Sequence, residues 1–338
     1  MQQYSPELVV VITGASSGIG RAAARAFAER GAAVVLVARR LKALEAAARE
    51  CRHLGGTAEV VEADVSEAGQ VELVAETVLQ RFGRLDVWVN NAAVSLFGRL
   101  EDCPPKVYEQ VIRTNLFGTV NGCRVAVRQF RRQGYGRLIN VSSVVGLIGQ
   151  PYTSAYCASK FAIRGLSESL RMELRDSPGI TVSTVLPAAI DTPIFRTAAN
   201  YTGMAPKAMD PVYPPEQVAE AICGLVDHPQ PEVIVGNAGR LLAVLEKAAP
   251  MAVAEALMAR QVEKNHFDET KEVPASAGNV LAPSSDDEGR VRDGWLAPAD
   301  GAWQPGEKLL VGLAAFATVL AATAYLGSRS TAARHGQP

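Results

Sequence analysis

Residues 8–20 read LVVVITGASSGIG, a short run of apolar, mostly β-branched residues that leads directly into a loop with three glycines. Such a run is typical of a buried parallel strand. An alanine-rich stretch at 21–30 predicts a helix that ends at Gly31, and 32–38 is a second apolar run. This order predicts the first half of a nucleotide-binding βαβ unit, in which glycines let the backbone approach a pyrophosphate at the helix N-terminus. A plain tight turn is the alternative.

The end of the second predicted strand indicates which dinucleotide would fit. NAD sites usually place an acidic residue there for the ribose 2′-hydroxyl, whereas NADP sites place a cation near the 2′-phosphate. These positions read Ala38-Arg39-Arg40, without a carboxylate. Because Arg39 can form a bidentate pair with a phosphate, the sequence favours NADP. The alternative is a pair of surface arginines that opens a helix.

Strands and helices continue to alternate beyond this unit. Helices are expected at 41–53 and 70–82, and strands at 58–61, 85–89 and 138–141. This rhythm predicts an α/β fold, a doubly wound parallel sheet of the Rossmann type with three α/β/α layers. Ligands of such sheets bind at the carboxyl ends of the strands, where the sequence places Asp64, Asn90-Asn91 and Ser142-Ser143.

The stretch 142–165 reads SSVVGLIGQPYTSAYCASKFAIRG and places Tyr156 four residues before Lys160 in a segment that is expected to be helical. Four residues span about one helical turn, so both side chains would project from the same face. The unperturbed pKa of a phenol is about 10, and a nearby ammonium lowers it toward useful proton transfer. Alone, this spacing favours a solvated helix face over a catalytic pair.

Five features in this order resemble the short-chain dehydrogenase/reductase family over residues 9–195: TGASSGIG at 13–20, NNAA at 90–93, Asn115, Ser143 and Tyr156-x-x-x-Lys160. The resemblance implies a catalytic set of Asn115, Ser143, Tyr156 and Lys160. Tyr156 would be the acid/base and Ser143 would hydrogen-bond the substrate oxygen. Lys160 would hold the nicotinamide ribose and lower the Tyr156 pKa, and Asn115 would orient a water of the proton relay.

The resemblance also implies a cofactor site for NADP(H). Its candidate residues are Thr13, Gly14, Ser16, Ser17, Gly18, Ile19, Gly20, Arg39, Asp64, Val65, Asn91, Ala92, Ala93, Tyr156, Lys160, Pro187, Ile190 and Thr192. Two positions depart from the family pattern, because Ala93 and Ala188 stand where glycines are usual. Alanine is restricted at positive φ, so we expect Ala188 to affect the loop over the nicotinamide and to weaken the assignment of Ile190.

Composition and charge exclude several other classes of protein. The chain has 338 residues, a formal net charge of -1 and no long basic run, which makes nucleic acid an improbable partner. Its five cysteines and four histidines show no metal-ligand spacing, so we expect no metal and a reducing compartment. The first residues, MQQYSPEL, are too short and too polar for a signal peptide. The catalytic part is therefore expected in the cytosol.

The C-terminal third has a different composition. We expect the catalytic domain to span 1–266, with a substrate lid at about 196–215 and a helix at 241–262. Residues 267–308, rich in Pro, Gly and Ser, predict a flexible linker before 19 uncharged residues at 309–327 and a short tail at 328–338. A helix of that length spans roughly 28 Å, close to a bilayer core of about 30 Å, and predicts a C-terminal transmembrane anchor. The alternative is a helix buried in an oligomer.

These expectations together favour an NADPH-dependent oxidoreductase. Its substrate would be the carbonyl or alcohol group of a hydrophobic small molecule, because an anchored enzyme meets substrates that partition into the bilayer. The resemblance implies a homodimer or homotetramer. The alternatives are a non-catalytic NADP-binding scaffold or sensor, and an epimerase or dehydratase of the same family.

Overall fold

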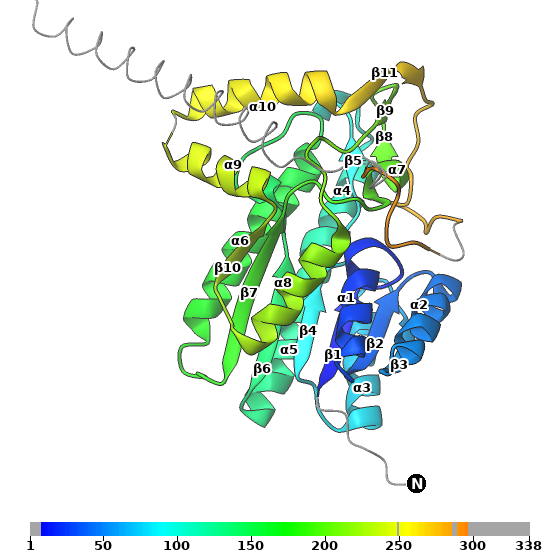
Figure 1. Ribbon diagram of the computed structural model, residues 1–338, viewed down its shortest axis with the longest axis vertical. Coiled ribbons are helices and arrows are strands. Elements are labelled where there is room, and N and C mark those ends of the chain that lie inside the picture. The colour runs from blue at the N-terminus through cyan, green and yellow to red at the C-terminus, as the bar shows by residue number, and fades with distance from the viewer. Residues whose placement is uncertain (1–7, 249, 286–288, 297–338) are drawn as a thin grey trace, which may run out of the picture. The chain divides into compact units, whose positions relative to one another are not determined.

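The computed structural model describes residues 8–248, 250–285 and 289–296 (Figure 1). Its centre is a seven-stranded parallel sheet with the strand order β10-β7-β6-β4-β1-β2-β3. The strands are β1 (Val9–Thr13), β2 (Ala33–Ala38), β3 (Thr57–Glu62), β4 (Val87–Asn90), β6 (Gly136–Val141), β7 (Ile180–Pro187) and β10 (Glu232–Val235). The order reverses beside β1, and the predicted doubly wound parallel sheet is confirmed.

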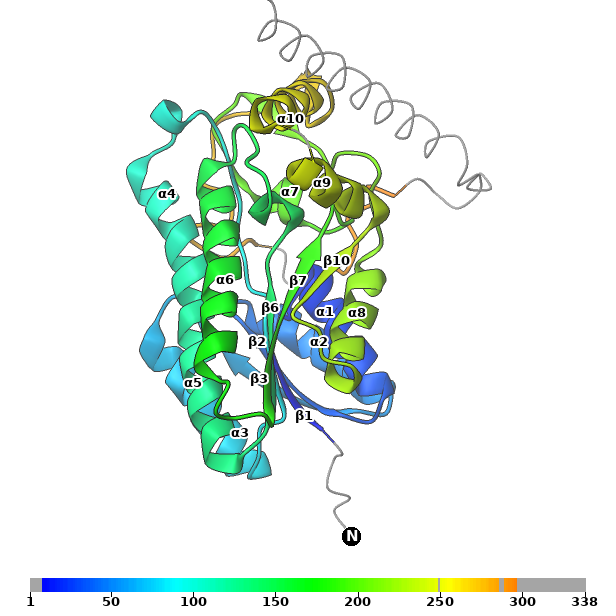
Figure 2. The same ribbon diagram turned by 90° about the vertical axis from the view of Figure 1, so that its left-hand side faces the viewer.

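Helices cover both faces of this sheet (Figure 2). One layer holds α1 (Gly18–Glu29), α2 (Leu41–His53) and α8 (Pro215–Asp227), and the other holds α3 (Ala68–Phe82), α4 (Pro105–Ile112), α5 (Gly118–Gln133) and α6 (Ser154–Glu173). Successive residues of a strand point to opposite faces, so Val10 and Ile12 pack in one apolar cluster and Val9 and Val11 in the other. Burial on both sides explains why β1 is a continuous apolar run.

Several short elements lie at the carboxyl edge of the sheet. They are β5 (Leu96–Phe97), η1 (Leu100–Asp102), η2 (Arg113–Phe117), η3 (Val144–Gly146), α7 (Ile194–Thr197), β8 (Ala199–Asn200) and β9 (Met204–Pro206). The stretch 196–215 therefore contains the end of α7 and both β8 and β9. Its movement as a lid stays a prediction.

The prediction of a single helix at 241–262 is wrong. The structure has two helices, α9 (Asn237–Ala248) and α10 (Met251–Asn265), with Pro250 between them. Proline lacks the N–H that a helix interior needs and clashes with the preceding turn. The position of Pro250 in the sequence was a sufficient signal.

The linker expected at 267–308 also differs from the structure where its residues are described. Strand β11 (Phe267–Glu272) pairs antiparallel with β9, and residues up to Leu296 belong to one compact unit with the sheet. We name residues 276–285 and 289–296 the C-terminal strap. The strap is bound largely through backbone groups, such as the Asn279 amide that donates to the Thr197 carbonyl. Because any residue type supplies such groups, its Pro-, Gly- and Ser-rich composition did not reveal the binding.

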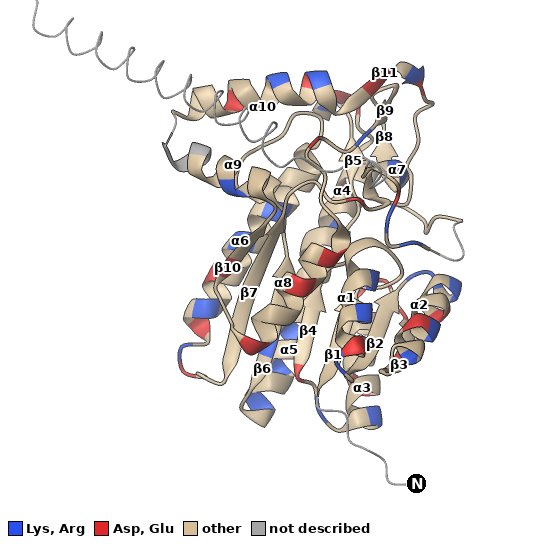
Figure 3. Cartoon of the chain, in the orientation of Figure 1, with Lys and Arg blue, Asp and Glu red and all other residues tan. Residues whose placement is uncertain are grey.

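The predicted membrane segment 309–327 lies outside the described residues, as does the tail 328–338. Among the described helices, none has the length and apolar character that a bilayer crossing requires. The five cysteines are free and buried. Acidic and basic residues alternate on α2 and α10 rather than forming a face of one sign (Figure 3).

Candidate active and cofactor site

The glycine loop between β1 and α1 is held by close packing against the end of β4. A Cβ atom at Gly14, where φ is +69°, would lie 2.8 Å from the Ala92 Cα, and one at Gly20 would overlap the Gly14 carbonyl. The Thr13 hydroxyl accepts hydrogen bonds from the amides of Asn91 (2.9 Å) and Ala92 (3.1 Å). Both glycines are thus required by the packing of the loop, and the loop leaves the start of α1 facing the carboxyl edge of the sheet.

Two arginines stand at the end of β2 beside this loop. Arg39 Nη1 lies 3.8 Å from Asp64 Oδ2, and burial lowers the pKa of Arg39 while Asp64 partly opposes this. Arg40 Nη2 donates to the hydroxyls of Ser16 and Ser17, each at 3.1 Å. Arg40 was not among the predicted site residues, although its place directly after Arg39 was the signal. The two side chains form a cationic corner next to the start of α1.

The residues after β3 form the next wall of the site. Asp64 Oδ1 accepts from the Ser66 amide at 2.9 Å and from its hydroxyl at 2.7 Å. Val65 is buried, its carbonyl accepts from Asn121 Nδ2 at 3.0 Å, and its side chain packs closely against Gly118. Val65 in the loop after β3 is therefore held against α5, and the Asp64 carboxylate is held by Ser66 in the same loop.

Asn115 lies on η2, a π-helical turn between α4 and α5, and is fully buried. Its Oδ1 accepts from the Val94 amide at 2.8 Å, and its Nδ2 donates to the Val94 carbonyl at 3.0 Å and to Ser159 Oγ at 3.1 Å. Single π-turns inside helices occur frequently at functional sites. Asn115 thereby joins the segment after β4 to helix α6, and Ser159 is a partner that the sequence did not reveal.

Ser143, Tyr156 and Lys160 lie together at the carboxyl end of β6. Lys160 Nζ is 5.3 Å from the centroid of the Tyr156 ring and donates to the Val141 carbonyl at 2.9 Å. Ser143 caps η3, where its hydroxyl accepts from the Val145 amide at 3.3 Å, and it donates to the Pro187 carbonyl at 3.5 Å. The two side chains expected at the substrate oxygen, Ser143 and Tyr156, are thus adjacent to Lys160, which was expected to hold the nicotinamide ribose.

The expected effect of Lys160 on Tyr156 is not found. Burial raises the pKa of Tyr156, which a hydrogen bond with Ser143 only partly opposes, and burial lowers the pKa of Lys160 to about 7. A lysine that is partly neutral near pH 7 exerts less of the attraction that would favour the phenolate. The spacing of the two residues indicated their adjacency but not the water-excluded surroundings that determine both pKa values.

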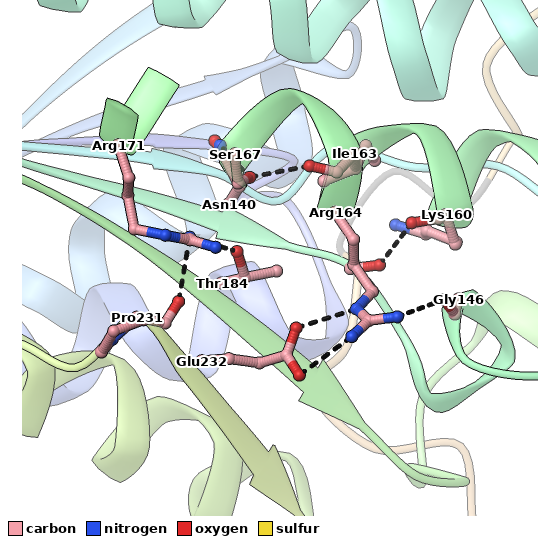
Figure 4. Close-up of polar contacts among 11 residues, drawn as sticks. Asn140, Gly146, Lys160, Ile163, Arg164, Ser167, Arg171, Thr184, Pro231 and Glu232 are labelled. Atoms are coloured by element: carbon pink, nitrogen blue, oxygen red, sulfur yellow. Dashed lines mark hydrogen bonds and ion pairs between the residues drawn. The ribbon is translucent and has the colours of Figure 1, made fainter. Parts of the chain in front are cut away.

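Helix α6 is tied to β10 by an ion pair and to η3 of the Ser143 loop by a hydrogen bond, and sequence reasoning missed both. Arg164 donates to both Glu232 carboxylate oxygens, at 2.8 and 3.2 Å, and its Nη1 donates to the Gly146 carbonyl at 3.0 Å (Figure 4). The Ser142 hydroxyl donates to the Lys160 carbonyl at 2.8 Å. These bonds fix α6, β10 and η3 relative to one another, so Arg164 and Glu232 are positioning residues for the Ser143 loop.

Two alanines replace glycines without backbone strain. Tyr152 is the one non-glycine residue with positive φ in the part of the chain that the structure describes, so neither Ala93 nor Ala188 occupies that region. The positive φ that would strain Ala188 is therefore not found, and the effect of its methyl group on the loop over the nicotinamide stays a prediction. Ile190 is buried in the core and pairs with Tyr213, whereas the Thr192 side chain lies directly against Gly18. Thr192 is better placed than Ile190 to contact a ligand at the glycine loop.

A doubly wound sheet with a glycine loop, a cationic corner after β2 and an adjacent Ser-Tyr-Lys set defines a dinucleotide-binding oxidoreductase. Residues 8–201 match the short chain dehydrogenase family model, and the chain belongs to that family, the short-chain dehydrogenase/reductases. It is 42% identical over 247 residues to the uncharacterized oxidoreductase YxnA of Bacillus subtilis, which covers 72% of this chain and 69% of the relative.

Solved structures give the same assignment. The alcohol dehydrogenase of the archaeon Thermococcus sibiricus, complexed with 5-hydroxy-NADP, is 32% identical with a TM-score of 0.60, over 68% of this chain and 95% of that one. A short chain dehydrogenase/reductase of Burkholderia phymatum in complex with NAD is 26% identical with a TM-score of 0.64, over 72% and 95%. One of these structures contains an NADP derivative and the other contains NAD, so the choice between the two cofactors has to be argued from this chain's own residues.

Proposed function

We propose that this protein is an NADPH-dependent oxidoreductase that interconverts the carbonyl and alcohol groups of a hydrophobic small molecule. The observation that carries the proposal is the adjacency of Ser143, Tyr156 and Lys160 at the carboxyl end of β6, at the same sheet edge as the glycine loop. Catalytic groups of open α/β sheets lie at this edge. The proposed reaction needs a proton donor beside a carbonyl oxygen, and Tyr156 is the candidate.

The donors around the start of α1 fit a phosphorylated dinucleotide. The Gly18 amide, the Ser16 and Ser17 hydroxyls and the guanidinium groups of Arg39 and Arg40 are all positive or hydrogen-bond donating. Phosphate groups bind at such helix N-termini, and a guanidinium fork suits a 2′-phosphate. In the Thermococcus structure an NADP derivative is bound. We expect Arg39→Ala to lower the preference for NADPH over NADH.

The chain's own groups would handle the proton while the bound cofactor supplies the hydride. A raised pKa keeps Tyr156 protonated near neutrality, which is the form that donates to a carbonyl oxygen. The Ser143 hydroxyl would donate a second hydrogen bond to that oxygen. Asn115 holds α6 against the segment after β4 and thereby fixes the height of Tyr156 in the site.

The test is to follow NADPH absorbance with a panel of ketones, aldehydes and lipid carbonyls, with Tyr156→Phe as the control. We expect NADPH oxidation with at least one carbonyl class and its loss by about two to four orders of magnitude in the variant. Turnover that survives removal of the hydroxyl would refute the role of Tyr156. Binding of NADPH with no turnover on any carbonyl would favour a scaffold or sensor instead.

The proposal keeps the homodimer or homotetramer and the C-terminal membrane anchor at 309–327 as predictions. High-speed centrifugation of the full-length protein without detergent tests the anchor. Full-length protein that stays in the supernatant would refute it.

A further inference from the structure

We propose that the C-terminal strap is an intramolecular competitor that occupies the cofactor site and must leave it before a dinucleotide binds. The inference rests on the proposed NADP(H) site and adds a regulatory element to it. Three parts of that site are bonded to different parts of the strap: the cationic corner after β2, the start of α1, and residues 191–192 after β7.

The cationic corner is bonded to strap carbonyls. Arg39 Nη2 donates to the Asn279 carbonyl at 2.6 Å, and its Nη1 donates to the Val280 carbonyl at 3.4 Å. Arg40 Nη1 donates to Ser284 Oγ at 3.3 Å. A 2′-phosphate would need the same guanidinium N–H groups, so the strap oxygens take the place of phosphate oxygens here.

The glycine loop is bonded to the second part of the strap. The Gly18 amide, at the start of the twelve-residue helix α1, donates to the Arg290 carbonyl at 2.9 Å. Gly289 has φ of +63°, and a Cβ atom there would overlap the Ser16 carbonyl oxygen. The strap backbone thus lies in contact with the loop, and the helix N-terminus that suits a pyrophosphate already has an acceptor.

The far end of the strap is bonded beside Thr192. Asp191 is 1% exposed, and its carboxylate accepts from the amides of Asp293 (3.0 Å), Trp295 (2.9 Å) and Leu296 (3.5 Å). The Trp295 indole donates to the Thr192 carbonyl at 3.3 Å. The family resemblance implies that Thr192 approaches the nicotinamide carboxamide, so the strap would span the site from its 2′-phosphate end to its nicotinamide end.

The strap is well bound but not fully paired. Val280 is fully buried in an apolar cluster with Val94 and Val111, which holds the first part of the strap in place. Next to it, Asn279 Oδ1 is buried and has no hydrogen-bond partner among the described residues. A buried unpaired acceptor makes a bound conformation less stable than a fully paired one. This pattern suits a segment that is displaced by a better ligand.

The chain directly before the strap is anchored, so a displaced strap would stay tethered near the site. Strand β11 is paired with β9, and just beyond it the Val273 amide donates to the Gly203 carbonyl at 3.0 Å. A tethered competitor acts at a high effective concentration. The apparent dissociation constant of a ligand is then its intrinsic value divided by the fraction of molecules in which the strap has left the site.

The test compares two alanine substitutions in the full-length chain. Gly289→Ala places a Cβ against the Ser16 carbonyl, whereas Gly294→Ala, at φ +84°, has no atom within 4 Å of the new Cβ. Both carry the strain of positive φ, so their difference isolates the overlap. We expect Gly289→Ala to lower the NADPH dissociation constant about tenfold and Gly294→Ala to change it less than about threefold. Val280→Asp, which buries a charge in the apolar cluster, is a second displacing variant and is expected to act like Gly289→Ala.

Hydrogen–deuterium exchange gives a readout that does not depend on activity. In the wild-type chain NADPH is expected to speed exchange of the amides of 276–285 and 289–296, and Gly289→Ala is expected to do so without nucleotide. If NADPH slows this exchange and the displacing variants weaken binding, the strap covers the bound cofactor and the inference is wrong. An NADPH affinity that is unchanged in both Gly289→Ala and Val280→Asp also overturns the inference but leaves the proposed function intact. Absence of NADPH binding in the wild type and in every variant overturns both.

Discussion

Replacement of Lys160 by methionine is expected to change how stability depends on pH. Lys160 is 2% exposed, and burial lowers its pKa from 10.5 to about 7. A folded-state pKa below the unfolded value means that the unfolded chain binds more protons between these limits, so stability rises with pH there. The contribution is fully present above pH 10.5 and is lost as pH falls toward 7.

The magnitude follows from the two pKa values. Each pH unit inside the window corresponds to about 1.4 kcal/mol. Because Lys160 is already half protonated in the folded chain at pH 7, its contribution rises by roughly 2 kcal/mol between pH 7 and pH 9. The Lys160→Met chain lacks this contribution. Burial raises the pKa of Cys51 to about 11, so cysteines oppose the rise, but they do so equally in both chains.

The assay is equilibrium urea unfolding of the wild type, Lys160→Met and Lys106→Met at pH 7, 8 and 9. Lys106 is exposed on α4 and serves as the matched control. We expect the free energy of unfolding of the wild type to gain about 2 kcal/mol over Lys160→Met across this range, and none over Lys106→Met. A difference between wild type and Lys160→Met that stays constant with pH would show that Lys160 keeps its charge when folded, and the reasoning from burial would be wrong.

Three further predictions follow from the site. Arg164→Ala removes the bonds to Glu232 and Gly146, so kcat should fall about tenfold with little change in KM. Glu232→Gln should lower kcat in the same way but by less. A change in KM alone would contradict this positioning role. Gly20→Ala should lower the free energy of unfolding by about 1–3 kcal/mol in urea titrations, because the new methyl overlaps the Gly14 carbonyl, and a neutral result would contradict the loop packing. Burial lowers the pKa of His266 to about 4, so its contribution to stability is lost as pH falls through 6.5 toward 4. In the same unfolding assay, the free energy of unfolding of His266→Phe should therefore fall by about 2 kcal/mol less than that of the wild type between pH 7 and pH 5.

The central sheet and the glycine loop were predictable because local physics determines them. Strand β1 is buried on both faces and therefore appears in the sequence as a continuous apolar run. Gly14 and Gly20 are required by close backbone packing, which only glycine satisfies. The adjacency of Tyr156 and Lys160 follows from helical spacing alone.

The pKa of Tyr156 and the binding of the strap were not predictable in the same way. A pKa depends on how much water surrounds a group, and residue spacing carries no information on that. The strap is held by the carbonyls of Asn279, Val280 and Arg290, and a backbone carbonyl is the same in every residue. The ion pair of Arg164 with Glu232 joins residues 68 positions apart, and no local pattern connects them.

Binding of the strap in the cofactor site should stabilise the protein without ligand and, for the same reason, lower its affinity for a cofactor. A partly buried guanidinium or helix N-terminus needs an acceptor, and without a dinucleotide the strap supplies it to Arg39 and to the Gly18 amide. Gly289→Ala should therefore lower the melting temperature of the unliganded chain and yet increase the shift that saturating NADPH produces. A strap that only stabilised the fold would lower both melting temperatures equally. The difference between the two shifts thus separates competition for the site from a purely structural role.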